Sequence, residues 1–280
     1  MSGLDPKETT DDAFLGGALR ILQPKAGFRA GMDSLLLAAS IDGRGHILDV
    51  GAGAGVVGLA VAHRVAEAEV VLVERDPHLL ELARANIARN GLAGRARAIG
   101  ADIARPLREL GELSAGAESF DHALANPPYH TLGRCTPAPA GGKRAAHAMP
   151  GGELERWLRF MAAMVKPGGV ISLVHRADAL GAILAASSGR FGGHVIVPLH
   201  ARPAAAASRV LVHAIKGSRA PLRLLAGVVL HEKDGRFRAE IEDVLRGGAG
   251  LQAAGPAVEL ESASVQALSW QGASSIGSKV

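Results

Sequence analysis

Runs of apolar residues separated by polar turns divide the chain into short strands and longer helices. Seven short runs have the length of buried strands, at residues 46–50, 70–74, 95–100, 119–125, 170–175, 194–199 and 208–215. Between them, apolar residues recur at helical spacing at residues 34–41, 56–68, 79–90, 153–165 and 177–188. Strands that alternate with helices are typical of βαβ units. We therefore expect one α/β domain with a seven-stranded, mostly parallel sheet and helices on both faces.

Segments outside this pattern set the expected domain boundaries. Residues 1–13 are polar and predict a flexible N-terminal tail, and residues 247–280 are rich in Gly, Ala and Ser and predict a flexible C-terminal tail. The domain between them, residues 14–246, contains a long Pro-, Gly- and Ala-rich stretch at 131–152 that predicts a mobile loop. Residues 221–245 carry an Asp-Gly turn signal between apolar runs, which predicts a hairpin.

The most informative stretch follows the first strand. Gly51, Gly53 and Gly55 alternate directly after that strand and directly before the helix at 56–68. Glycines let the backbone turn sharply and let a ligand approach where a Cβ would clash. A strand, a glycine loop and a helix in this order favour a nucleoside-containing cofactor, and a tight turn without a ligand is the simpler alternative.

Acidic residues at three strand ends indicate which cofactor the predicted site binds. Glu74 ends the second strand, where a carboxylate can accept both hydroxyls of a ribose. Asp49 would repel a pyrophosphate but suits a cation, so it favours S-adenosylmethionine over NAD. Asp102 follows the third strand and is expected to accept a bond from the adenine amine or to cap the next segment. The candidate cofactor-binding residues are Asp49, Gly51, Ala52, Gly53, Gly55, Glu74, Arg75, Asp102, Ile103 and Asn126.

A tetrapeptide after the fourth strand carries the candidate chemistry. The two prolines of Asn126-Pro127-Pro128-Tyr129 cannot lie in a central strand or a helix interior, so they fix the backbone where ligands bind in open α/β sheets. The Asn126 side-chain oxygen and the Pro127 carbonyl can each accept one N–H of a planar amine, and Tyr129 can stack on the ring. All four are candidate catalytic residues, with a rigid turn and a surface tyrosine as the simpler alternative.

These motifs, in this order, resemble those of the class I S-adenosylmethionine-dependent amino methyltransferases over residues 46–175. Residues 19–38, 209–217 and 230–237 further resemble the family of tRNA adenine-N6 methyltransferases that modify a valine tRNA beside its anticodon. The resemblance implies a Rossmann-like methyltransferase sheet, S-adenosylmethionine as cofactor and an adenine of tRNA as acceptor. It also implies Asn126 as the residue that orients the amine.

Charge adds candidate contacts to such a substrate. The net charge is +4 and the pI about 9.6, which suits nucleic acid, although the excess is small. The candidate substrate-binding residues are Arg29, Asp33, Arg134, Lys143 and Arg144. A solvated arginine and a simple helix cap are equal alternatives for the first two. Disorder is an equal alternative for the loop that holds the other three.

The composition indicates in which cellular compartment the protein is expected. The single cysteine, Cys135, excludes an internal disulfide and fits a reducing cytoplasm, and no cluster with metal-ligand spacing is found. No apolar run is long enough to span a membrane, and the polar, acidic N-terminal stretch is unlike a signal peptide. We expect a cytoplasmic protein without a metal, and the sequence leaves the oligomeric state open.

The function expected from these observations is methylation of the exocyclic N6 amine of an adenine in tRNA, with the base flipped into the site. The nearest alternatives are the same chemistry on a release-factor glutamine or an rRNA guanine. The 45 residues before residue 46 favour the shorter RNA-methylating relatives over these. Alternatives of other classes are a non-catalytic RNA- or protein-binding module and an NAD-dependent oxidoreductase. The intact glycine loop and tetrapeptide argue against the former, and Asp49 argues against the latter.

Overall fold

A central β-sheet organises the chain. The computed structural model describes residues 8–27, 29–41, 44–128 and 151–251. All seven expected strands are present: β3 (Gly45–Val50), β4 (Ala68–Glu74), β5 (Ala96–Gly100), β6 (Phe120–Ala125), β7 (Val165–Arg176), β8 (Phe191–His200) and β9 (Ala207–Lys216). They are arranged in the order β5-β4-β3-β6-β7-β9-β8, and only β9 runs antiparallel to its neighbours among them. The α/β class and the mostly parallel sheet are confirmed.

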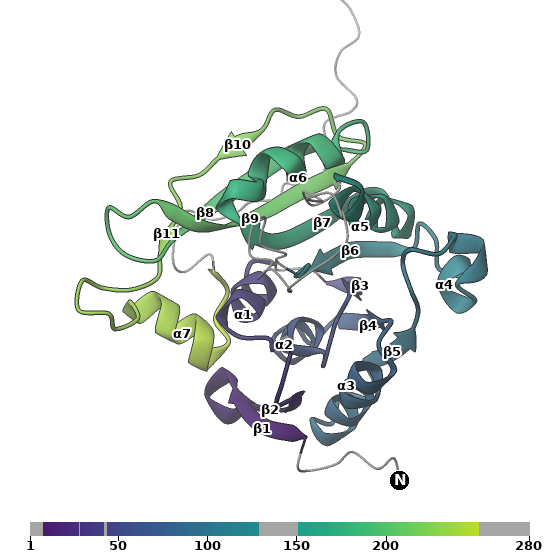
Figure 1. Cartoon of the computed structure of the whole chain (residues 1–280), viewed down its shortest axis with the longest axis horizontal. Coiled ribbons are helices and arrows are strands. Elements are labelled where there is room, and N and C mark those ends of the chain that lie inside the picture. The colour runs from purple at the N-terminus through teal and green to yellow at the C-terminus, as the bar shows by residue number, and fades with distance from the viewer. Residues whose placement is uncertain (1–7, 28, 42–43, 129–150, 252–280) are drawn as a thin grey trace, which may run out of the picture.

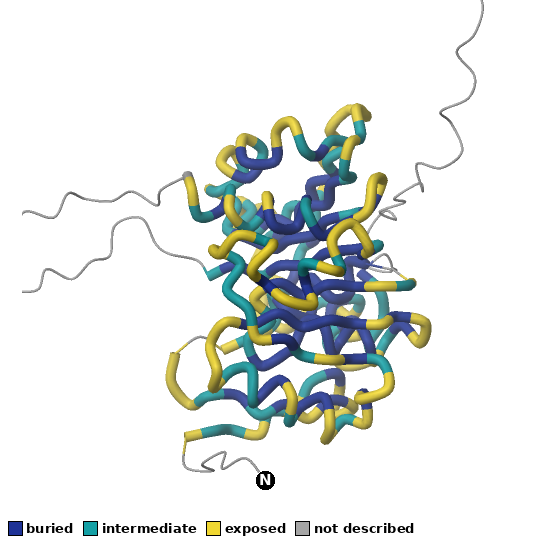
Figure 2. Tube along the Cα trace, turned by 90° about the vertical axis from the view of Figure 1, so that its right-hand side faces the viewer, coloured by how far each residue is buried: buried dark blue, intermediate teal, exposed yellow. Residues whose placement is uncertain are grey.

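Helices cover both faces of this sheet (Figure 1). One face carries α1 (Met32–Ala39), α2 (Val56–Arg64), α3 (Pro77–Arg89) and α7 (Ala239–Gly247), and the other carries α4 (Glu112–Ala115), α5 (Gly151–Met164) and α6 (Leu180–Ser187). Because side chains alternate along a strand, Ile47 belongs to the core of the first face and Leu48 to that of the second. Figure 2 shows that the buried residues run through the middle of the molecule and that the exposed residues lie mostly at its periphery.

The direction of chain progression across the sheet reverses at β3. This strand lies between β4 and β6, so the chain first fills one side of β3 with β4 and β5 and then the other side with β6 and β7. At such a switch point the loops after neighbouring strands diverge and leave a crevice at the carboxyl ends. The glycine loop and the Asn-Pro-Pro turn both follow strands that border this crevice.

Two local features fix the helices next to the crevice. Asp76 caps α3, where its Oδ1 accepts the backbone N–H groups of His78 and Leu79 at 2.9 and 3.0 Å, and Pro77 occupies the first helical turn. Gly58 lets α2 lie directly on β4, since an added Cβ would clash with Leu72 Cδ2 and lie 2.9 Å from Val70 Cγ1. The sequence therefore sets both the start of α3 and the close approach of α2.

The N-terminal segment is more ordered than expected. Residues 9–13, predicted to belong to a flexible tail, form β1 (Thr9–Phe14), which pairs antiparallel with β2 (Leu19–Pro24) across the 3-10 turn η1 (Leu15–Gly17). Asn86 of α3, fully buried, explains the order. Its Oδ1 accepts the N–H of Leu22 at 2.8 Å, and its Nδ2 donates to the carbonyls of Leu22 and Ala54, each at 2.9 Å. This side chain ties the hairpin to the glycine loop.

The predicted hairpin over residues 221–245 forms only around its Asp-Gly turn, where the N–H of Glu232 donates to the carbonyl of Arg236 at 2.8 Å, and the longer strands predicted on either side are wrong. The short strands β10 (Arg223–Leu224) and β11 (Val228–Val229) both run parallel to β8, and residues 239–247 form α7. Only one antiparallel bridge, His231 to Phe237, spans the Asp-Gly turn. Ile241 and Val244, spaced as on one helical face, are buried against the core, and this burial favours a helix over a strand. Of the expected C-terminal tail, residues 252–280 lie outside the described residues.

The remaining short elements are the 3-10 turns η2 (Leu107–Glu109) and η3 (Ala177–Ala179). Among the helices within the described ranges, none has the length and apolar character needed to cross a bilayer.

Candidate functional site

A cavity of about 310 Å³ lies at the carboxyl ends of β3, β4, β5 and β6, where the strand order reverses. Its size falls within the range of small-ligand sites. We call it the carboxyl-edge cavity. It is lined by Gly51, Gly53, Val73, Glu74, Arg75, Asp76, Leu79, Ala101, Asp102, Ile103, Ala104, Asn126, Pro128, Glu153, Arg156 and Trp157.

The glycine loop forms the floor of this cavity. Gly51 and Gly53 have φ angles of +64° and +58°, a left-handed conformation that L side chains rarely adopt. Gly51 is required for a second reason, because a Cβ there would clash with Cη2 of Trp157 and lie 2.9 Å from its Cζ3. The loop thus leaves its backbone accessible to a ligand.

Glu74 is held in a fixed orientation by three backbone groups. Its Oε1 accepts the N–H of Arg75 and of Asp76, both at 2.8 Å, and its Oε2 accepts the N–H of Gly53 at 2.9 Å. The residue is only 8% exposed but lines the cavity. A carboxylate offers about four acceptor positions, so one remains on Oε2 for a hydroxyl donor such as that of a ribose.

Asp49 lies beneath the loop rather than in the cavity lining. It is 1% exposed, and its Oδ2 accepts the N–H of Gly58 at 2.8 Å. Burial raises the pKa of Asp49 to about 7, and the negative charge of Glu74 acts in the same direction. The structure thus places Asp49 outside the cavity lining, where its carboxyl group fixes the start of α2 below the loop.

Asn126 is oriented by a residue from α1. Its Nδ2 donates to the hydroxyl of Ser34 at 3.1 Å, and Ser34 is 1% exposed. Because the amide is planar, holding Nδ2 toward α1 also fixes Oδ1, the acceptor end. Pro127 is buried, Pro128 lines the cavity, and Tyr129 lies outside the described residues.

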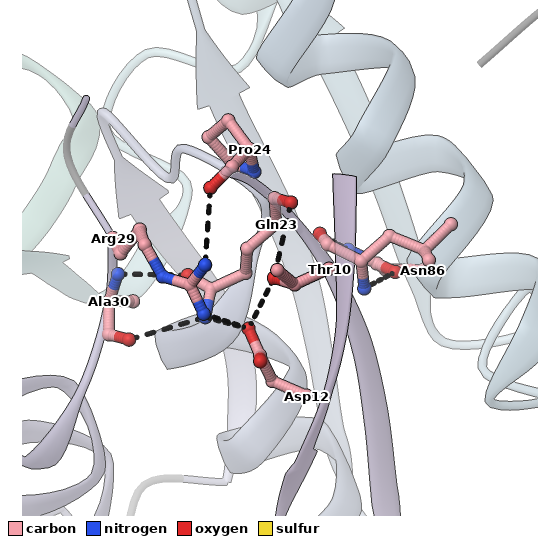
Figure 3. A network of polar contacts seen from close by, with 8 residues as sticks. Thr10, Asp12, Gln23, Pro24, Arg29, Ala30 and Asn86 are labelled. Atoms are coloured by element: carbon pink, nitrogen blue, oxygen red, sulfur yellow. Dashed lines mark hydrogen bonds and ion pairs between the residues drawn. The ribbon is translucent and has the colours of Figure 1, made fainter. Parts of the chain in front are cut away.

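Of the candidate substrate-binding residues, the structure describes Arg29 and Asp33, and neither is among the residues that line the cavity. Arg29 pairs with Asp12 at 2.7 Å and donates to the Pro24 carbonyl, within the polar network of the N-terminal hairpin (Figure 3). Asp33 accepts from Nε of Arg209 at 3.0 Å. It is not the cap of α1, since the helix begins at Met32. Arg134, Lys143 and Arg144 lie outside the described residues.

Most of the predicted cofactor residues meet at the cavity. Its lining includes Gly51, Gly53, Glu74, Arg75, Asp102, Ile103 and Asn126, and it does not include Ala52 or Gly55. Asp102 also accepts the N–H of Ala104 at 2.9 Å, so it fixes the turn after β5 while facing the cavity. No metal-ligand group of three or more His, Cys, Asp or Glu is found within the described part of the chain.

Sequence reasoning missed the contribution of α5. Glu153, Arg156 and Trp157 all line the cavity, and none of them is among the candidate site residues predicted from the sequence. The indole of Trp157 is partly buried against the core of the second face while its benzo ring contacts Gly51. The amphipathic pattern predicts the helix but not this contact, because Gly51 lies in a loop 106 residues away.

Comparison with known proteins assigns this site to a family. The model of the "Methyltransferase small domain" family matches residues 29–140. The crystal structure of a protein described as a predicted O-methyltransferase from Agrobacterium tumefaciens is similar, with a TM-score of 0.66 and 34% identity, over 78% of this chain and 97% of that one. The chain belongs to the class I methyltransferases. The cofactor of this family is S-adenosylmethionine. When bound, it supplies a methyl group on a positively charged sulfur.

The residues present fit this cofactor. A ribose hydroxyl would take the remaining acceptor position of Glu74, and Asp102 lies farther along the same cavity for an adenine amine. No heavy atom lies within 4 Å of a Cβ added at Gly53, so the loop leaves room beside that glycine for the rest of the molecule. The lining of the carboxyl-edge cavity therefore fits the cofactor of this family.

Curated relatives differ in the acceptor that their names state. The tRNA1(Val) (adenine(37)-N6)-methyltransferase of Tolumonas auensis is 31% identical over 167 residues, 58% of this chain and 65% of that protein. The release factor glutamine methyltransferase of Moorella thermoacetica is 30% identical over 164 residues, 55% of each protein. The chain thus spans less than two thirds of the length of each of these relatives.

Proposed function

We propose that this class I methyltransferase transfers a methyl group to the exocyclic N6 amine of an adenine in tRNA. The observation that carries the proposal is the placement of Asn126. Its amide, oriented by Ser34, lines the same cavity as Glu74 and the glycine loop. An acceptor amine beside Asn126 would therefore lie next to the cofactor site.

Methyl transfer to an adenine amine requires mainly that the protein orient the amine toward the cofactor. The lone pair of an adenine amine is delocalised into the ring, so the amine is a poor nucleophile until its two N–H groups are held. Asn126 Oδ1 and the Pro127 carbonyl are the two acceptors that would hold them. The bound cofactor would supply the methyl group, with its sulfur keeping the electron pair of the broken carbon–sulfur bond. Asn126 and Pro127 would hold the amine in line for the new nitrogen–carbon bond, and the amine would then release one proton to water.

Two observations favour adenine in tRNA as the acceptor. The sequence resembles the tRNA adenine-N6 methyltransferases over most of its length, and a relative of that name aligns over 58% of the chain. The release factor glutamine methyltransferase supports the nearest alternative, since a glutamine amide is also a planar amine. An rRNA guanine is the other acceptor with such an amine. A non-catalytic binding module remains the alternative of another class.

Methyl transfer from labelled S-adenosylmethionine tests the acceptor. Unmodified tRNA, fully modified tRNA, rRNA and a release factor are incubated in parallel, and the labelled products are digested and separated. We expect the label in N6-methyladenosine of unmodified tRNA. Label in the release factor or in guanosine would keep the enzyme class and overturn the acceptor, and an absence of label despite cofactor binding would favour the binding module.

A further inference from the structure

The first turn of α1 connects two strands that are not neighbours in the sheet. Ser34, in this turn, accepts a hydrogen bond at 3.1 Å from Nδ2 of Asn126, which follows β6. Asp33, the residue before it, accepts a hydrogen bond at 3.0 Å from Nε of Arg209 in β9. Because β7 lies between β6 and β9, the turn spans two strand spacings, about 10 Å of the sheet. Movement of this turn would therefore displace the hydroxyl that orients Asn126.

Arg209 lies at the same edge of the sheet as Asn126. Because β9 runs antiparallel to β7, it begins at the carboxyl edge, and the register places Arg209 opposite Arg176, the last residue of β7. Nη1 of Arg209 donates to the carbonyl of Ser208 at 3.1 Å, so the guanidinium is held on β9 while Nε donates to Asp33. The side chains of Arg209 and Asp33 are only 32% and 21% exposed, which limits competition by water and salt.

The start of α1 depends on attachments to other elements. Gly31, which has no side chain, occupies the N-cap position, so α1 lacks the kind of side-chain cap that fixes the start of α3. One residue earlier, Ala30 is held by the amide of Gln23, with its N–H donating to Oε1 at 2.9 Å and its carbonyl accepting from Nε2 at 3.3 Å (Figure 3). The chain is thus fixed on the side of the N-terminal hairpin before α1 begins, and Asp33 supplies an attachment on the side of β9.

We infer that Arg209 is a positioning residue for methyl transfer. Through Asp33 it holds the first turn of α1, so that the hydroxyl of Ser34 stays within hydrogen-bond distance of Asn126. The inference rests on the proposed function, in which Asn126 orients the acceptor amine. It gives Asp33, a candidate substrate-binding residue, a role that needs no contact with the substrate.

The side-chain amide of Asn126 reports on this arrangement without an acceptor. The sequence contains three asparagines, Asn86, Asn90 and Asn126, so a chain labelled with ¹⁵N in asparagine alone gives three side-chain amide signals in an NMR spectrum. The signal that disappears in Asn126→Asp belongs to Asn126. We expect Arg209→Gln to move this signal toward its position in Ser34→Ala, while the signals of Asn86 and Asn90 stay in place.

Three further variants separate positioning from the loss of a positive charge. Arg176→Gln is the matched control and should leave the Asn126 signal in place, because Arg176 lies opposite Arg209 at the same edge but donates to Asp178 instead of to α1. Asp33→Ala removes the partner of Arg209 and should move the signal as Arg209→Gln does. Arg209→Lys keeps the charge and should move the signal less.

Steady-state kinetics on the acceptor measure the consequence for transfer. We expect Arg209→Gln to lower kcat roughly three- to tenfold while KM for the acceptor is unchanged. In a Ser34→Ala background the same substitution should cause no further loss, because both changes act on the orientation of Asn126. Arg176→Gln should leave kcat unchanged.

Two results would overturn the inference. An Asn126 signal that stays in place in Arg209→Gln would mean that Ser34 keeps its position without Arg209. A rise in KM at unchanged kcat would make Arg209 a contact to the substrate. A signal that moves as expected, with no N6-methyladenosine formed by the wild-type chain, would instead overturn the proposed acceptor and keep the role of Arg209.

Discussion

The buried carboxyl of Asp49 makes the stability of the protein depend on pH in a defined direction. Burial raises its pKa from 3.8 to about 7 in the folded chain. The folded state therefore binds the proton more tightly than the unfolded state, and ionisation destabilises the fold as the pH rises from 4 to 7. At about 1.36 kcal/mol per pH unit, the cost is roughly 1.6 kcal/mol at pH 5 and roughly 4.4 kcal/mol above pH 7.

Asp49→Asn removes this titration with little change in shape. The amide oxygen can still accept the N–H of Gly58, so the bond beneath the glycine loop is kept. Burial of the uncharged amide changes the free energy of unfolding of the variant by the same amount at every pH. We therefore expect the free energy of unfolding of Asp49→Asn to rise relative to wild type by about 3 kcal/mol between pH 5 and pH 8.

Urea denaturation without cofactor, at pH 5, 6, 7 and 8, measures this difference. The comparison cancels other titrations, including those of His122 and His213. Burial lowers their pKa values to about 3 and about 4, so both imidazoles destabilise each protein as the pH falls below 6.5. A difference between Asp49→Asn and wild type that stays constant with pH would refute the reasoning, because Asp49 would then titrate as an exposed carboxyl does.

Three further substitutions test the supports of the site. Ser34→Ala should lower the methyl-transfer rate about tenfold or more without changing cofactor affinity, because the hydroxyl orients Asn126. Ser34→Thr should restore the rate, and steady-state kinetics and calorimetry measure the two quantities. Asn86→Ala should lower the free energy of unfolding in urea by roughly 2–4 kcal/mol, since three hydrogen bonds are lost. Gly58→Ala should cost roughly 1–3 kcal/mol in the same assay through its clash with Leu72, and Leu72→Ala should lower this cost.

Local chemistry explains which parts of the fold the sequence predicts. The glycine loop and the Asn-Pro-Pro turn each follow a strand directly and Glu74 ends one, so their place at the crevice follows from the alternation of strands and helices. The cap of α3 by Asp76 is equally local.

Contacts between distant residues explain what the sequence does not predict. β1 is ordered because it pairs with β2, which is hydrogen-bonded to Asn86, 64 residues later in the chain. Residues 239–247 form a helix because Ile241 is buried against elements that lie far earlier in the chain. Trp157 reaches Gly51 and Ser34 reaches Asn126 only once the sheet has formed. An amphipathic helix pattern cannot distinguish a side chain that fills the core from one that also lines a cavity.

The central claim is that Asn126 aligns the acceptor amine and is not needed to hold the cofactor. The most direct measurement compares wild type and Asn126→Ala in two assays, namely the rate of N6-methyladenosine formation on unmodified tRNA and the dissociation constant of S-adenosylmethionine. We predict that the substitution abolishes transfer while cofactor affinity changes by less than about fivefold. A parallel loss of cofactor binding, or transfer at the wild-type rate, would contradict the account.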